Sequence, residues 1–216
     1  MYIATSVSWL QTIDNLDGKT AKFSDTITEM YTQKTIDTLK QGGIGIIPTD
    51  TLYGLVGSAL NKQTVERIYK LRKRPQVKPC IILISKPDDL KLFGISLDNF
   101  TKSFLKKNWP NPLSVILPCS NSKFEYLHRS GKTLAFRMPN DQKLLGLLNQ
   151  TGPLVAPSAN FEGEKPAQTI KEAKKYFGDQ VDFYEDGGKL TGLPSTLVSI
   201  EDGQVKVLRQ GQFMVK

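Results

Sequence analysis

Basic side chains are concentrated in one short segment of the chain. Seven Lys and Arg residues stand between Lys62 and Lys78, against a single acid, Glu66. Guanidinium groups bind phosphate oxygens through paired hydrogen bonds and Lys adds a point charge, so this segment could hold a nucleotide or an RNA backbone. Most basic runs are instead solvated helix faces, which leaves both interpretations open at this point.

A second set of polar residues follows the ends of predicted buried strands, where open α/β sheets usually bind ligands. Such turns contain Thr51, Ser158, Asn160 and Ser195. Each of these alone is more often a turn former or a cap than a binding residue. Arg137 is different because it interrupts an apolar run, and a charge there must face a partner in the core or in a cleft. The segments concerned are 48–55, 72–79, 109–113, 134–139, 156–160, 193–198 and 208–209.

The sequence disfavours some common kinds of site. The single histidine, His128, lies in the polar stretch 120–132, which we expect to be a mobile loop, with closure over a ligand as a second interpretation. Ser-His-Asp chemistry and histidine-ligated zinc are therefore not favoured. Cys80 and Cys119 are too few for a disulfide framework or a four-ligand metal site, and we predict that both are buried packing residues.

The composition is that of an ordinary globular domain. Of 216 residues, 39% are hydrophobic and 23% are charged, which fits neither a collagen-like, a coiled-coil nor a wholly disordered chain. No apolar run approaches the ~18 residues of a membrane span, and the first residues lack the basic region of a signal peptide. We therefore expect a cytoplasmic protein with no membrane partner. The net charge of +8 favours polyanionic partners.

Apolar strands alternate with amphipathic helices along the chain. The predicted helices are 26–41, 62–73 with Asn61 as its cap, 97–107, 140–150, and one that starts at Thr169. The predicted strands are 44–47, 80–85, 113–118, 133–138, 153–156, 197–200 and 205–208, with a further apolar segment at 52–60. Asp202-Gly203 predicts a hairpin between the last two strands. The pattern indicates one α/β domain, residues 24–216, after an N-terminal arm of residues 1–23, with a twisted mixed parallel and antiparallel sheet flanked by helices.

In the polar segments, read in order from about residue 43 to residue 211, the sequence resembles the YrdC/TsaC family in its short, single-domain form. These proteins are the L-threonylcarbamoyladenylate synthases of tRNA modification. The resemblance implies a YrdC-like fold with an open basic cleft. It also implies a nucleotidyltransferase that converts ATP, L-threonine and bicarbonate into L-threonylcarbamoyl-AMP and pyrophosphate, for N6-threonylcarbamoyladenosine at position 37 of tRNA. A YciO-like paralogue that binds RNA or nucleotide without synthase activity is the alternative.

The resemblance also assigns roles to individual residues. The threonine-binding positions that it implies are Thr51, Arg137, Ala156 and Ser195. The ATP-binding positions that it implies are Arg72, Arg74, Lys78, Thr133, Ser158, Asn160, Pro166 and Arg209. The catalytic positions among them are Arg74, Lys78 and Arg137. We expect Mg²⁺ to be carried by the nucleotide without a protein metal site. The implied partners are tRNA or double-stranded RNA and a downstream threonylcarbamoyl transferase.

Overall fold

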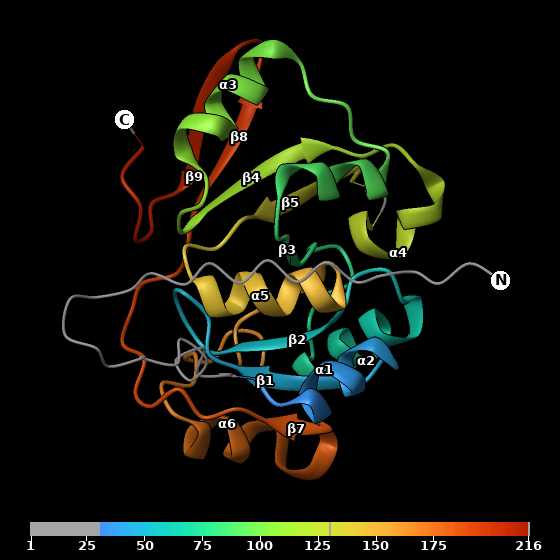
Figure 1. The fold of residues 1–216 in the computed structure, drawn as a ribbon, viewed down its shortest axis with the longest axis vertical. Helices are drawn as coiled ribbons and strands as arrows, with labels where there is room; N and C mark the ends of the chain where they lie inside the picture. The colour runs from blue at the N-terminus through green and yellow to red at the C-terminus, as the bar shows by residue number, and fades with distance from the viewer. Residues whose placement is uncertain (1–30, 130, 216) are drawn as a thin grey trace, which may run out of the picture. The chain divides into compact units, whose positions relative to one another are not determined.

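A nine-stranded sheet organises the part of the chain that the computed structural model describes, residues 31–129 and 131–215. The strands lie in the order β7-β1-β2-β6-β3-β5-β4-β8-β9 (Figure 1). Their bounds are β1 (Ile44–Ile47), β2 (Gly54–Ser58), β3 (Ile81–Leu83), β4 (Leu113–Pro118), β5 (Thr133–Arg137), β6 (Leu154–Val155), β7 (Phe183–Tyr184), β8 (Thr196–Glu201) and β9 (Gln204–Arg209). The pairs β1–β7, β3–β5 and β4–β8 are parallel and the other neighbours are antiparallel, which confirms the predicted mixed sheet.

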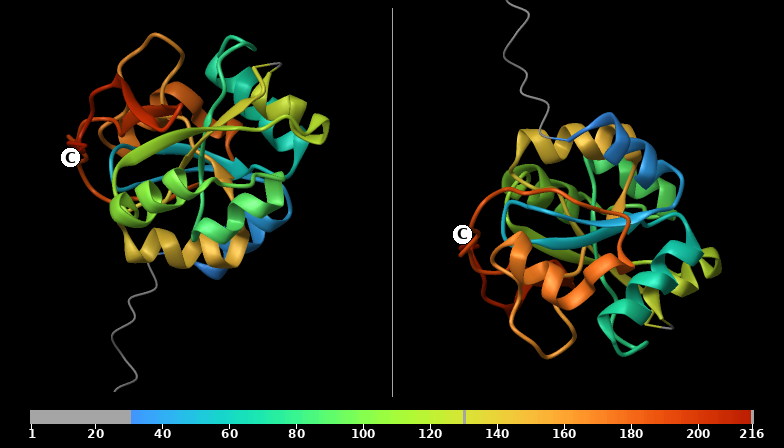
Figure 2. Two further views of the ribbon diagram at one scale, coloured as in Figure 1. Left: turned by 90° about the horizontal axis from the view of Figure 1, so that it is seen from above. Right: turned by 90° about the horizontal axis from the view of Figure 1, so that it is seen from below.

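Helices lie on both sides of the sheet. The α-helices are α1 (Gln33–Lys40), α2 (Lys62–Arg72), α3 (Asn99–Asn108), α4 (Glu125–His128), α5 (Gln142–Thr151) and α6 (Ile170–Phe177), and the 3-10 turns are η1 (Pro87–Phe93), η2 (Ser122–Phe124) and η3 (Gly178–Gln180). In Figure 2, α1 and α5 run side by side on one side of β1 and β2, and α6 lies on the other side. Both faces of β1 are therefore covered, as its continuous burial requires.

Local sequence explains where the main elements begin and end. Asn61 accepts a hydrogen bond from the backbone N–H of Thr64 and so caps α2, as predicted. Thr169 caps α6 in the same way, through the N–H of Glu172. Asp202 and Gly203 have φ angles of 50° and 70°, the left-handed values of a two-residue hairpin turn, which confirms the hairpin between β8 and β9.

The structure corrects the prediction for the stretch 120–132. It is not a mobile loop in its first half: η2 and α4 fold there, and Phe124 and Leu127 are each only 2% exposed. These two apolar side chains stand three residues apart, so one helical turn places both against the core. The ring of Phe124 packs against Phe93 at 5.0 Å between centroids. His128 is buried in the same turn.

Other differences concern the ends of elements. The predicted strand 80–85 pairs only over β3, and the apolar segment 52–60 only over β2. The helix predicted for 26–41 is α1 in its described part, and residues 26–30 lie outside the described residues, as does the predicted arm of residues 1–23, so its boundary stays a prediction. Cys80 and Cys119 are free and buried, as predicted. Among the described residues, no helix combines the length and the apolar character that a membrane crossing needs.

Candidate functional site

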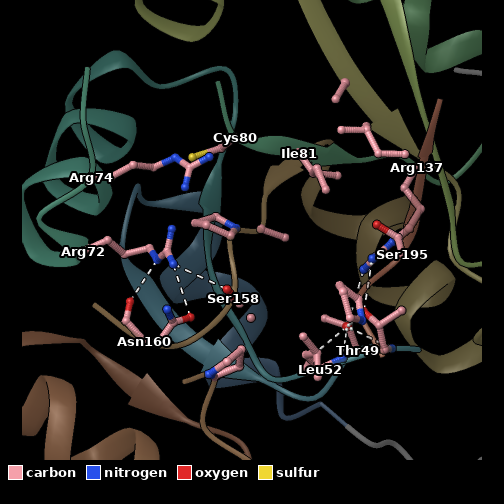
Figure 3. Close-up of a pocket in the computed structure, with 18 of the residues that line it drawn as sticks. Thr49, Leu52, Arg72, Arg74, Cys80, Ile81, Arg137, Ser158, Asn160 and Ser195 are labelled. Atoms are coloured by element: carbon pink, nitrogen blue, oxygen red, sulfur yellow. Dashed lines mark hydrogen bonds between the residues drawn. The ribbon is translucent and has the colours of Figure 1, made fainter. Parts of the chain in front are cut away.

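A cavity of about 650 Å³ lies against one face of the central strands, where alternate residues of β5, Thr133, Ala135 and Arg137, line it (Figure 3). Among the predicted site residues, those that line it are Thr51, Arg72, Arg74, Thr133, Arg137, Ala156, Ser158, Asn160, Pro166, Ser195 and Arg209. Lys78 does not line the cavity, and 58% of its side chain is exposed. Figure 3 shows Arg72, Arg74, Ser158 and Asn160 on one side of the cavity, and Arg137 and Ser195 on the other.

Arg137, the last residue of β5, forms one wall of the cavity. Its Nη1 donates to the Thr51 hydroxyl at 3.1 Å, and its Nη2 donates to Thr49 at 3.4 Å. The Asp50 carboxylate lies 3.2 Å from the same Nη2, and both side chains are almost fully buried. Burial lowers the pKa of Arg137, the charge of Asp50 opposes that shift, and the nearby charge of Arg209 adds to it. Arg137 Nε is buried and has no hydrogen-bond partner among the described residues. Nη1 and Nη2 each carry two N–H groups, so the guanidinium keeps donors beyond its bonds to the two threonines.

Ser195 and Arg209 continue this wall from β8 and β9. Arg209 donates to the Ser195 carbonyl at 2.8 Å from Nη2 and at 3.2 Å from Nε, and Nη2 is 3.3 Å from the Ser195 hydroxyl. That hydroxyl lies 2.9 Å from the hydroxyl of Ser114 on β4, where either oxygen can be the donor. The Ser195 hydroxyl is therefore held from two sides while its residue lines the cavity.

Arg72 organises the opposite wall from the C-terminal end of α2. Its Nε donates to the Asn160 carbonyl at 3.0 Å, and its Nη2 lies 3.2 Å from Asn160 Oδ1 and 3.4 Å from the Ser158 hydroxyl (Figure 3). Lys73 then adopts a left-handed conformation with φ of 53°, which ends the helix and turns the chain before Arg74. Burial, together with the charge of Arg74, lowers the pKa of Arg72.

Glu162 connects the cations of this wall. Its carboxylate accepts from Arg74 at 2.7 Å, from Lys78 at 3.1 Å and from Arg72 at 3.3 Å. Partial burial alone would raise the pKa of Glu162, but the hydrogen bond from Lys78 and the charges of Arg74 and Arg72 outweigh it and hold the pKa below the ordinary value. Glu162 is therefore ionised at neutral pH.

The residues of the site that were not predicted from the sequence include Asp50, Ser114 and Glu162. Ser114 carried a usable signal, because it is a polar residue inside the apolar strand 113–118, as Arg137 is in its own strand. Asp50 lies between two threonines of a turn and Glu162 follows the Ser-Ala-Asn loop, where a carboxylate is unremarkable. Only the fold brings these carboxylates to their cations.

The arrangement can bind two different anionic groups side by side. Four arginines line the cavity, with Arg72 and Arg74 on one wall and Arg137 and Arg209 on the other. Two or more guanidinium groups on one wall suit a phosphate chain, and a buried guanidinium beside hydroxyl groups suits the carboxylate of a small polar molecule. Apolar side chains from the strands, Ile81 and Ile116 among them, line the space as well.

Comparison with known proteins agrees with this geometry. The profile of the Sua5/YciO/YrdC proteins, described as "Telomere recombination", matches residues 37–211. Threonylcarbamoyl-AMP synthase of Bacillus subtilis is 33% identical over 177 residues, which cover 80% of this chain and 51% of that protein.

Two solved structures resemble the fold. The crystal structure of Pyrococcus abyssi Sua5 complexed with L-threonine superposes with a TM-score of 0.76 at 29% identity, over 82% of this chain and 52% of that one. Escherichia coli YciO superposes with a TM-score of 0.73 at 25% identity, over 82% of this chain and 87% of that one. The chain thus spans about half the length of the Bacillus and Pyrococcus proteins. With a family profile matched over residues 37–211, this chain belongs to the Sua5/YciO/YrdC family.

Proposed function

We propose that this chain is a threonylcarbamoyl-AMP synthase, which converts ATP, L-threonine and bicarbonate into L-threonylcarbamoyl-AMP and pyrophosphate. The observation that carries the proposal is the shared cavity, in which a wall with Arg72 and Arg74 faces a wall with Arg137 and Ser195. The name of the Bacillus subtilis relative and the L-threonine in the Pyrococcus abyssi complex support it.

Threonine binds at the wall formed by Arg137. The guanidinium of Arg137 donates to the substrate carboxylate, and the hydroxyls of Thr51 and Ser195 orient its polar groups. The Asp50 carboxylate keeps this buried guanidinium compensated when no substrate is bound. Ala156 contributes a small side chain to the cavity at this point of the sheet.

ATP binds at the wall formed by Arg72 and Arg74. The two guanidinium groups contact phosphate oxygens, Ser158 and Asn160 hold Arg72 in place, and Lys78 adds a peripheral charge. Thr133, Pro166 and Arg209 line the remaining surface available to the nucleotide. Mg²⁺ that arrives with the nucleotide, held mainly by phosphate oxygens and water, neutralises phosphate charge.

The chemistry then requires placement more than proton transfer. The threonine amine adds to carbon dioxide derived from bicarbonate and loses a proton, which gives a carbamate. A carbamate oxygen forms a bond to the α-phosphorus while the bond from that phosphorus to the pyrophosphate oxygen breaks. Arg74 and Arg72 stabilise the negative charge that moves onto the leaving pyrophosphate, and Arg137 holds the attacking molecule in line.

The product supplies the threonylcarbamoyl group for adenosine 37 of tRNA through a downstream transferase, a reaction that takes place in the cytoplasm. The test measures pyrophosphate release with ATP, L-threonine and bicarbonate, and with each substrate omitted in turn. Release that needs all three supports the synthase. ATP hydrolysis without threonine excludes it, and RNA retention without threonine-dependent turnover identifies the chain as an RNA-binding relative of YciO instead.

A further inference from the structure

Glu162 binds the cations of the wall formed by Arg72 and Arg74, which we call the nucleotide wall. Oε2 accepts from Nη1 of Arg72 and Nη1 of Arg74, while Oε1 accepts from Lys78 Nζ. A carboxylate and a phosphate present paired acceptor oxygens to guanidinium groups in the same manner. Glu162 lines the cavity, with 22% of its side chain exposed.

The remaining donors of both arginines are held by other atoms. In Arg72, Nε and Nη2 are bound by Asn160 and Ser158. In Arg74, Nε donates to the carbonyl of Lys78 at 3.0 Å, and Nη2 donates to that of Pro79 at 3.0 Å. Only the Nη1 groups depend on Glu162. If its carboxylate departs, both guanidinium groups keep their orientation and each presents a free Nη1.

The backbone of Glu162 is fixed, so a departure needs only a rotation of the side chain. Its N–H donates to the carbonyl of Arg72 at 2.8 Å. The loop around it is closed by Asn160 Nδ2, which donates to the carbonyls of Phe161 and Glu164 at 2.6 and 2.9 Å. Partial exposure leaves water access to the carboxylate once it has rotated away.

We propose that Glu162 is a resident counter-ion of the nucleotide wall, which phosphate groups must displace to bind. The inference rests on the proposed function, because it concerns the same wall. Displacing the Glu162 carboxylate costs the same free energy for every phosphate ligand, so it lowers the affinity of each of them by the same factor. ATP retains its contacts elsewhere in the cavity, whereas inorganic phosphate and pyrophosphate have few others. Glu162 therefore keeps these smaller anions off the site and returns to the arginines as pyrophosphate leaves.

The experiment measures pyrophosphate and inorganic phosphate binding by calorimetry, without threonine, for the unmodified chain and for Glu162→Gln. We expect both anions to bind about tenfold more tightly to the variant. Glu164→Gln is the matched control, because Glu164 lies in the same loop, lines the same cavity and makes the same change in net charge. The affinity of Glu164→Gln for both anions should stay within about twofold of that of the unmodified chain.

A Glu162→Gln chain whose pyrophosphate affinity is unchanged or weaker overturns the proposal, since Glu162 would then organise the arginines for the ligand. Glu162→Asp guards against misfolding of the first variant: it keeps the charge on a shorter side chain, and should bind pyrophosphate more tightly than the unmodified chain, by less than Glu162→Gln does. An equal or weaker affinity in Glu162→Asp also counts against the idea. Tighter pyrophosphate binding by Glu162→Gln, together with an unmodified chain that shows no threonine-dependent turnover, would support the role of Glu162 as a counter-ion and refute the synthase.

Discussion

Two arginine–carboxylate pairs, each with an arginine that lines the cavity, differ in burial and in the elements that hold them. Arg137 and Asp50 have side chains that are 5% and 4% exposed, and the arginine ends a central strand of the sheet. Arg74 and Glu162 are 17% and 22% exposed, and both belong to connections between elements. In the first pair almost no surface of either side chain is open to water, while the second pair is partly exposed and can exchange its partner with a ligand or with water.

This difference suits the two tasks of the proposed site, which must bind two substrates. A charge buried without compensation is very costly, so Arg137 needs a carboxylate that never leaves. A substrate carboxylate can then use guanidinium N–H groups that Asp50 and the threonines do not occupy. A polyphosphate demands more donors than one guanidinium can spare, so its site needs cations whose present partner is replaceable. Glu162 meets that need because its contacts with the arginines are confined to Nη1.

The largest expected effect is on the free energy of unfolding, and it tests whether Arg137 depends on Asp50. Asp50→Asn leaves Arg137 as a buried charge without its carboxylate, and should lower the free energy of unfolding by about 3–5 kcal/mol. Glu162→Gln should change it by only about 1 kcal/mol, because water screens Arg74 and Glu162 and because Arg72, although 3% exposed, keeps its hydrogen bonds to Asn160. Urea unfolding followed by tryptophan fluorescence measures both. Similar losses in the two variants would show that the pairs do not differ in the proposed way.

The next effect concerns turnover. Arg74→Ala and Arg137→Ala should each lower kcat/KM for pyrophosphate release by about 100-fold or more, because each removes a charged donor that the reacting molecules need. Arg67→Ala is the matched control: Arg67 stands on the same helix as Arg72 but pairs with Asp182 outside the cavity, and its loss should change turnover less than about twofold. Equal losses in all three variants would point to a general effect of charge.

The sequence predicted the arginines of both pairs but neither carboxylate, for a physical reason. Arg137 is visible because a charge in a buried strand is rare and needs an explanation. Its partner Asp50 is not visible, because an aspartate in a turn satisfies local preferences and gives no sign of a partner far along the chain. Arg72 and Arg74 stand out as basic residues, but which of them face a cavity depends on where α2 ends, at Lys73.

Secondary structure followed local signals closely where caps and turns defined it, as at Asn61, Thr169 and Asp202-Gly203. It could not be predicted where tertiary contacts decide. The short strand β7 has only two residues and exists because it pairs with β1. The turn of η2 and α4 lies in a polar stretch, and the core contacts of Phe124 and Leu127 outweigh that composition.

A smaller effect, on the KM for threonine, is expected at the wall formed by Arg137 and Ser195. Ser114→Ala removes one of the two groups that hold the Ser195 hydroxyl, and should raise KM for threonine about fivefold, the worth of one hydrogen bond, with KM for ATP and kcat little changed. Ser199→Ala is the matched control, since Ser199 is a buried serine of β8 whose hydroxyl has no partner among the described residues. A rise in KM for ATP in Ser114→Ala would show that the two walls are not independent.

The smallest effect is the dependence of stability on pH at the exchangeable pair. The surrounding cations hold the pKa of Glu162 below its ordinary value of 4.5, so the unfolded chain takes up the proton first as pH falls. The contribution of Glu162 to stability is thus fully present above about pH 4.5, and is lost as pH falls through the lower pKa of the folded state. Urea unfolding of the unmodified chain and of Glu162→Gln should differ by up to about 1 kcal/mol at pH 7, and the difference should shrink as pH falls through the pKa of Glu162 in the folded chain. Convergence is expected because a protonated glutamate and a glutamine carry the same charge. A difference that does not shrink as the pH is lowered would mean that the shape of the side chain, and not its charge, supports the arginines, in which case a phosphate could not take its place.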